Sequence, residues 1–123
     1  MTLPSPPLLV ISDRLQARRP LVEIAEAAFR GGCRWYSLRE KDLPAAERRD
    51  LLRTLTLLGH RLGATVTAHE DIASVIALGG IDAANVAACL AAGARGIAVM
   101  GEAMRAADPE ETVRGLLAAI EKR

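Results

Sequence analysis

Short apolar runs alternate with longer segments of helical spacing along this chain of 123 residues. Four of the runs are rich in aliphatic, aromatic or β-branched residues and end at polar ones, as buried parallel strands do. They cover residues 8–11, 35–38, 65–68 and 97–100. Strands that alternate with helices predict βα units and a parallel sheet.

The helices between these strands are marked by prolines at their starts and glycines at their ends. Proline suits the first turn of a helix, and glycine suits the backbone that ends one. Asp108 before Pro109 adds a side-chain cap, with two acids in the first turn. The predicted helices therefore run from Pro20 to Gly31-Gly32, from Pro44 to Gly63, over 83–92 between Asp82 and Gly93, and from Pro109 to about Glu121.

Residues 73–78 have the β-branched content of a buried strand, and Gly79-Gly80 follow them. They begin only a few residues after the predicted strand 65–68. A parallel crossover needs roughly a dozen residues, so these two segments cannot be parallel neighbours within one chain. Residues 73–78 are therefore helical, or they occupy a different position in the sheet, or they pair in a partner subunit.

The composition predicts one packed domain over residues 1–123. Hydrophobic residues make up 50% of the chain and charged residues 25%, a balance typical of a globular protein rather than a disordered one. Three prolines within residues 1–7 predict an extended tail before the first strand. The aliphatic core residues suit strands covered by Ala- and Leu-rich helices.

The charge and the cysteines restrict the functional classes. The net charge is +1 with both signs interspersed, which argues against a nucleic-acid or membrane surface. No apolar run reaches transmembrane length, and residues 1–7 do not have the pattern of a signal peptide, so the expected location is the cytoplasm. Cys33 and Cys89 lie among apolar residues outside any CxxC pair, which predicts two buried, reduced thiols.

Five segments, taken in order, resemble motifs of the thiamine phosphate synthase/TenI family. They correspond to its first strand, its second strand, the start of its third helix, its seventh strand with a Gly-Gly loop, and its eighth strand. In this chain they read Leu-Val-Ile-Ser-Asp-Arg at 9–14, Ser-Leu-Arg-Glu-Lys-Asp at 37–42, Asp-Ile-Ala at 71–73, Val-Ile-Ala-Leu-Gly-Gly-Ile at 75–81 and Ala-Ala-Gly-Ala-Arg-Gly-Ile-Ala-Val-Met at 91–100.

The resemblance implies an α/β fold of parallel β/α units, shortened internally. The family's region between the third helix and the seventh strand has no counterpart here, and a closed (β/α)8 barrel needs about 200 residues. We therefore expect a partial, truncated TIM barrel of four or five strands. Its open inner face and strand edges would require cover, which predicts a homo-oligomer, most simply a dimer.

The second-strand motif supplies the main candidate site residues. The resemblance implies that it contacts pyrophosphate and pyrimidine. Arg39 and Lys41 lie two positions apart, so the end of an extended strand would point both to one side, and an Arg fork with a Lys point charge suits a phosphate. Solvated loop charges are the alternative. Ser37 stands where the family usually has Gln, a change that a TenI-like protein tolerates better than a synthase.

Two glycine-containing segments match the family's phosphate loops after strands seven and eight. They are Gly79-Gly80 and Met100-Gly101. Glycine lets backbone N–H groups approach a phosphate closely, and TIM barrels commonly hold phosphate at this position. A simple turn or helix stop at Gly79-Gly80 is the alternative.

The magnesium and acid–base residues of the family are poorly matched. Its Asn-Asp pair aligns with Thr67 and Ala68, which cannot replace a carboxylate for Mg²⁺; Glu70 is a substitute only if the alignment shifts. His69 could carry a proton at a strand end, although a surface histidine is the simpler interpretation.

Two functions follow from the resemblance. One is a thiamine-pathway protein that binds a phosphorylated thiazole or pyrimidine precursor, with activity either of a synthase-type transferase or of a TenI-type thiazole tautomerase. The other is a non-catalytic remnant that binds a ligand or serves as an oligomeric structural protein. The absent central strands argue against activity of the chain alone.

Overall fold

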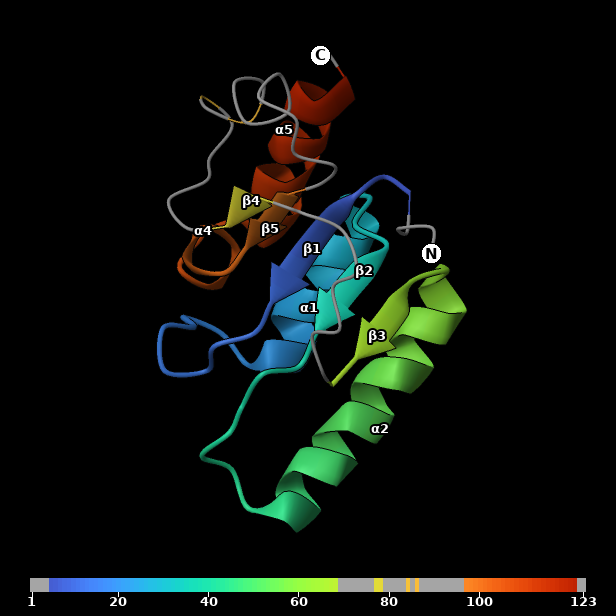
Figure 1. The fold of residues 1–123 in the computed structure, drawn as a ribbon, viewed down its shortest axis with the longest axis vertical. Helices are drawn as coiled ribbons and strands as arrows, with labels where there is room; N and C mark the ends of the chain where they lie inside the picture. Colours follow the sequence, from blue (N-terminus) through green and yellow to red (C-terminus); the bar gives the residue numbers. More distant parts are fainter. Residues whose placement is uncertain (1–4, 69–76, 79–83, 85, 87–96, 122–123) are drawn as a thin grey trace.

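The computed structural model describes residues 5–68, 77–78, 84, 86 and 97–121 (Figure 1). The strands within these ranges are β1 (Leu8–Ile11), β2 (Trp35–Ser37), β3 (Thr65–Thr67), β4 (Ala77–Leu78) and β5 (Ile97–Val99). The helices with described bounds are α1 (Leu21–Arg30), α2 (Ala45–Leu62), α4 (Gly101–Met104) and α5 (Pro109–Glu121).

The described strands form one parallel sheet in the order β3-β2-β1-β5-β4. β1 lies at its centre, where Leu9 pairs with Trp35 of β2 and with Ala98 of β5. In a closed β/α barrel the first strand likewise lies between the second and the last. The sheet is thus an arc of such a barrel, and the expected fold class is confirmed with five strands.

The ambiguous segment 73–78 is decided in part. Ala77 and Leu78 form β4, which pairs with β5 at the opposite edge of the sheet from β3. Of the alternatives left open by the sequence, these two residues therefore form a strand at a different position in the sheet of the same chain. Residues 73–76 lie outside the described ranges.

The helices pack against one face of the sheet, where α1, α2 and α5 lie behind the strands (Figure 1). Alternate strand residues such as Leu8, Val10 and Tyr36 contribute to the large core that these helices complete. The residues between them point to the other face and form a smaller buried cluster: Leu9, Ile11, Trp35 and Ala98. Period-two alternation therefore separates two cores, as a pleated strand requires.

The expectation of an open apolar inner face is wrong at these four positions. Leu9, Ile11 and Ala98 are each 1% exposed within the single chain, and Trp35 is 8% exposed. No second subunit is needed to remove these side chains from water.

The boundaries predicted for the helices that begin at Pro20, Pro44 and Pro109 are confirmed by the backbone. α1 begins after Pro20, and Gly32 follows its end with φ of 114°. Gly63 ends α2 in the left-handed conformation with φ of 77°, which glycine adopts without a steric cost. The Asp108 side chain accepts a hydrogen bond from the backbone N–H of Glu111 at 3.1 Å, as an N-cap does.

The aromatic and thiol groups of the helix-facing core are fully enclosed. The rings of Phe29 and Tyr36 meet edge to face, with centroids 5.9 Å apart. Burial raises the pKa of the Cys33 thiol to about 11, and this thiol donates to the carbonyl of Trp35. Burial, followed by the nearby Glu40 and Cys33 charges, also raises the pKa of Tyr36. Cys33 is thus a buried free thiol, as expected, whereas Cys89 lies outside the described residues.

Some local details differ from the sequence prediction. β2, β3 and β5 each end one residue earlier than expected, and Met100 precedes a four-residue helix, α4, that the pattern does not indicate. Of the helix predicted over 83–92, the structure describes only Val86 as helical, and this residue is buried. Among the described helices, none combines the length and apolar character needed to cross a membrane.

Candidate functional site

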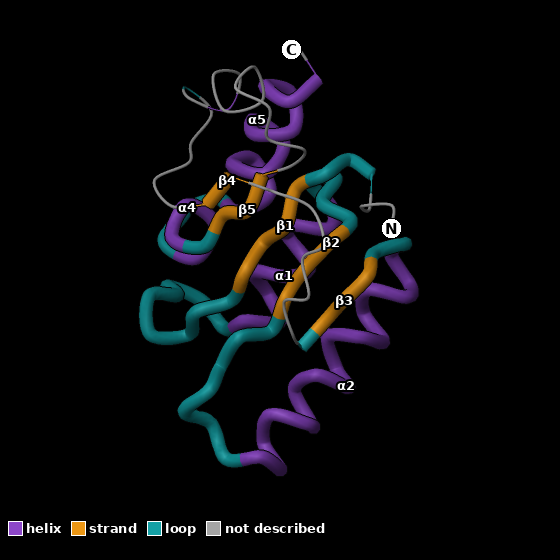
Figure 2. The backbone as a smooth tube through the Cα atoms, in the orientation of Figure 1, coloured by secondary structure: helices purple, strands orange, loops and turns teal. Residues whose placement is uncertain are grey.

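The loops that follow β1 and β2 leave the sheet at the same edge (Figure 2). These loops span residues 12–20 and 38–44, and α4 follows β5 at residue 101. Because all the strands are parallel, their carboxyl ends lie together at this end of the sheet, called the carboxyl edge below. β/α-barrel proteins place their active sites there, so the carboxyl edge is the candidate functional site.

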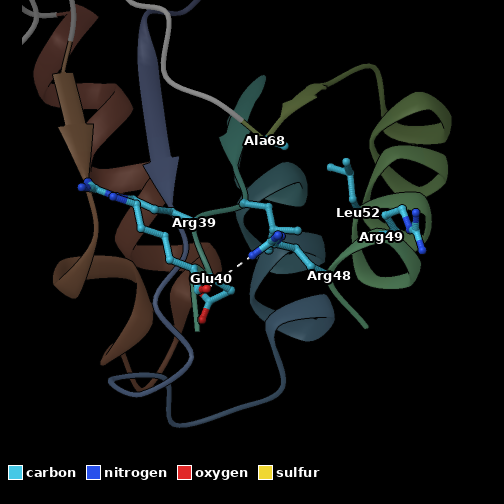
Figure 3. Close-up of a pocket in the computed structure, with 8 residues that line it drawn as sticks. Arg39, Glu40, Arg48, Arg49, Leu52 and Ala68 are labelled. Carbon is cyan, nitrogen blue, oxygen red and sulfur yellow. Dashed lines mark hydrogen bonds between the residues drawn. The ribbon is translucent and has the colours of Figure 1, made fainter. Parts of the chain in front are cut away.

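A pocket of about 390 Å³ opens beside the loop after β2 (Figure 3). It lies between this loop, the first turns of α2 and the residue that follows β3. Its lining combines an apolar base with charged side chains: Leu38, Arg39, Glu40, Lys41, Arg48, Arg49, Leu52 and Ala68. The structure thus brings the two predicted cations, Arg39 and Lys41, to one pocket.

Positive charge predominates in this lining. Four cationic residues contribute to it against the single carboxylate of Glu40. That carboxylate is buried and paired with Ser12 and Arg14 of the loop after β1. In Figure 3, Arg39 extends across the end of β1 toward β5, whereas Arg49 lies on the side of α2. The surroundings favour an anionic ligand.

Arg48 and Arg49 are the pocket residues that the sequence analysis missed. Arg48 is half-buried and donates to the backbone carbonyls of Lys41 and Leu43, both at 3.4 Å. It therefore ties the first turns of α2 to the loop that carries Lys41. The available signal was the proline start of α2: it places residue 48 one turn into a helix that directly follows the second-strand motif.

Ser37 lies at the carboxyl end of β2 and is 1% exposed. Within the described part of the chain, its hydroxyl has no hydrogen-bond partner. A buried unpaired hydroxyl costs free energy, so Ser37 is an unsatisfied polar group at the end of β2. It lies on the same side of its strand as Trp35, one residue before the pocket lining begins.

Met100 and Gly101 are near the same edge but do not line the pocket. Gly101 is the first residue of α4 and not part of a loop, which corrects the sequence expectation. The guanidinium of Arg105 packs directly over Gly101 and donates to the Gln16 side chain. A side chain at residue 101 would displace only the end of the flexible Arg105 side chain.

The remaining sequence candidates, Gly79, Gly80, His69 and Glu70, lie outside the described residues. Over the described ranges there is no cluster of three or more His, Cys, Asp or Glu residues that could hold a metal ion. The two acids of the loop after β2, Glu40 and Asp42, are both paired with Arg14. The donors described here therefore do not fit the magnesium site that the resemblance implies, and we derive no step through a metal.

Comparison with solved structures defines the class of the protein. A structure titled thiamine phosphate pyrophosphorylase from Pyrococcus furiosus superposes with a TM-score of 0.83 at 18% identity, over 94% of this chain and 95% of that one. A designed cube-shaped protein cage matches with a TM-score of 0.57 at 13% identity, over 94% and 72% of the two chains. The chain thus has the parallel, TIM-barrel-like fold of the first of these structures.

Curated sequences then point to a particular family. The chain is 40% identical over 73 residues to a putative thiamine-phosphate synthase of Geobacter sulfurreducens, which covers 58% of this chain and 34% of that protein. It is 36% identical over 75 residues to the thiamine-phosphate synthase of Moorella thermoacetica, with 59% and 36% covered. No protein-family model matches. The resemblance to thiamine phosphate synthases is confirmed, and the match spans about a third of the length of these relatives.

Proposed function

We propose that this chain is a thiamine phosphate synthase-like protein of thiamine biosynthesis that binds a phosphorylated thiazole or pyrimidine precursor. The observation that carries the proposal is the pocket at the carboxyl edge, with four cationic residues in its lining. An anion at this end of the sheet would lie near the cationic side chains of Arg39 and Lys41, which one loop carries. The similarity to two thiamine-phosphate synthases supplies the substrate class.

The residues of the pocket suit the stabilisation of a phosphate or a departing pyrophosphate. Arg39 offers a planar fork of donors, and Lys41 offers a compact charge on a flexible stem. Leu38, Leu52 and Ala68 give the pocket an apolar side, which suits the organic part of a precursor. Charge stabilisation of this kind accelerates a reaction in which an anion leaves.

The test is calorimetry with inorganic pyrophosphate, thiazole phosphate and thiamine phosphate. We expect weak binding by the unaltered chain and about tenfold weaker binding by the Lys41→Ala variant, since a lost charged hydrogen bond corresponds to about 1.4 kcal/mol. Arg53→Ala is the matched control, because Arg53 is an exposed cation of α2 outside the pocket lining. Equal affinities in all three proteins, or no heat at millimolar ligand, would remove the proposal.

The alternative function is that of a non-catalytic remnant which binds a ligand without turnover. It is favoured by Thr67 and Ala68, which stand where the family's metal-binding Asn-Asp pair aligns and offer no carboxylate. The calorimetry samples serve for an assay of the condensation with magnesium present. We expect binding without turnover; turnover that Arg39→Ala abolishes would contradict the non-catalytic alternative.

We also propose that the chain forms a homodimer through its strand edges. β3 and β4 are the two edges of the described sheet, and the side chain of Thr65 on β3 is exposed. An exposed edge is a template for pairing with another strand. Sedimentation equilibrium at micromolar concentration tests this: a dimer is expected, and a cooperatively folded 13.1 kDa monomer would contradict it.

A further inference from the structure

The carboxylate of Glu40 is buried at the rim of the candidate site. The residue is only 3% exposed, although it belongs to a loop. Its oxygens accept a hydrogen bond from the Ser12 hydroxyl at 2.7 Å and from the backbone N–H of Arg14 at 3.2 Å. The Arg14 side chain approaches to 3.7 Å. A buried carboxylate is tolerated only with such partners. The Glu40 carboxylate therefore joins the loop after β2 to the loop after β1.

Ser12 links this carboxylate to the backbone of Arg39 by two hydrogen bonds. Ser12 is completely buried, and its hydroxyl oxygen accepts a hydrogen bond from the Arg39 N–H at 2.8 Å. A hydroxyl has one proton to donate. Because that proton is directed to Glu40, the lone pairs of the oxygen are left for the Arg39 N–H. The chain of contacts from Glu40 through Ser12 therefore fixes the backbone from which the Arg39 side chain extends.

The contacts with the loop after β1 separate the acidic side chains of the loop after β2 from its basic ones. Arg14 pairs with Asp42 at 2.6 Å as well as with Glu40. Both acids of the segment 39–42 are thus held by the loop after β1, whereas both cations of the segment line the pocket. Without this pairing, the two acids would be available to Arg39 and Lys41 and would compete with an anionic ligand.

We propose that Ser12 and Glu40 are positioning residues of the anion pocket: they set the backbone of Arg39, and thereby its side chain, for a phosphate-bearing ligand. The inference rests on the proposed function. It goes beyond that function because Ser12 does not line the pocket and the carboxylate of Glu40, although it borders the pocket, is held by Ser12 and Arg14. A purely structural role would lower stability without changing what Arg39 contributes to binding.

A double-mutant cycle separates the two roles. Binding of inorganic pyrophosphate to the full chain is measured by calorimetry for Ser12→Ala, Arg39→Ala and the double variant. We expect Arg39→Ala to weaken binding about tenfold in the unaltered chain and only about twofold in the Ser12→Ala background, since contacting residues couple. Arg49→Ala is the matched control, because this cation lines the pocket from α2 and should cost the same in both backgrounds.

The outcomes distinguish this inference from the proposed function. Pyrophosphate binding with an unchanged effect of Arg39→Ala in the Ser12→Ala background overturns the positioning role alone. An unaltered chain that binds no pyrophosphate overturns both. If Ser12→Ala does not fold, Glu40→Gln enters the same cycle. Hydrogen exchange of the Arg39 N–H in the unaltered chain is an independent measurement: protection is expected, and exchange at the rate of a free loop amide contradicts the network.

Discussion

The two faces of the sheet are both buried, yet they are built differently. Leu8 and Leu9 are neighbours on β1 and are 0% and 1% exposed. Leu8 belongs to the large core completed by α1, α2 and α5, whereas Leu9 belongs to a cluster of four buried residues. The described buried polar residues, Ser12, Ser37 and Glu40, all lie at the carboxyl edge. Most of the buried apolar residues therefore lie on the helix-facing side of the sheet, whereas the described buried polar residues lie at the carboxyl ends of its strands.

The largest expected effect tests this difference on one strand. Leu8→Ala should lower the free energy of unfolding by about 4–5 kcal/mol, and Leu9→Ala by about 2–3 kcal/mol. The removed atoms are the same, but the larger helix-facing core has more surrounding side chains to hold the cavity open. Urea unfolding followed by circular dichroism measures both values. Equal losses, or a larger loss for Leu9→Ala, would show that the inner cluster is as important for stability as the helix-facing core.

A smaller effect is expected where α1 ends against α5. A Cβ at Gly31 would lie 2.6 Å from the carbonyl oxygen of Glu110 and 3.2 Å from the Cβ of Val113. Because backbone atoms would have to move, Gly31→Ala should destabilise the chain by about 1–3 kcal/mol. Pyrophosphate binding by the folded fraction should be unchanged, since the site lies at the other end of the helix.

The control for this substitution has the opposite sign. Gly115 lies within α5, and a Cβ there would meet nothing within 4 Å. Gly115→Ala should therefore stabilise the chain by about 0.5–1 kcal/mol through helix propensity alone. Thermal unfolding of the two variants makes the comparison. A stabilising Gly31→Ala would contradict the close contact between α1 and α5.

Local signals were sufficient for most of the elements because each depends on a few neighbouring residues. Gly63 predicted the end of α2 through its left-handed backbone, and Asp108 predicted the start of α5 through its capping side chain. α4 was missed because four residues are too few to show a period. β4 was ambiguous because apolar residues of this length suit a buried strand or a helix equally well.

The candidate site was predictable only where its residues belong to one segment. Arg39 and Lys41 were found because they are adjacent to a strand end in a motif. Arg48 and Arg49 were not found, because a basic pair on a helix is usually solvated and only the packing of α2 beside the loop brings the pair to the pocket. The contact between Ser12 and Glu40 joins residues 28 positions apart, a separation at which sequence spacing carries no geometric information.

The sequence by itself determined the βα alternation, the limits of most helices and the resemblance to thiamine phosphate synthases. These features depend on periodicity, capping and motif order, which are properties of short segments. Only the tertiary structure decided that β4 is the edge strand beside β5, that the inner-face residues are buried within one chain and that Glu40 is enclosed by the loop after β1. Each of these depends on contacts between distant segments, whose free energy is gained only when the whole sheet has formed.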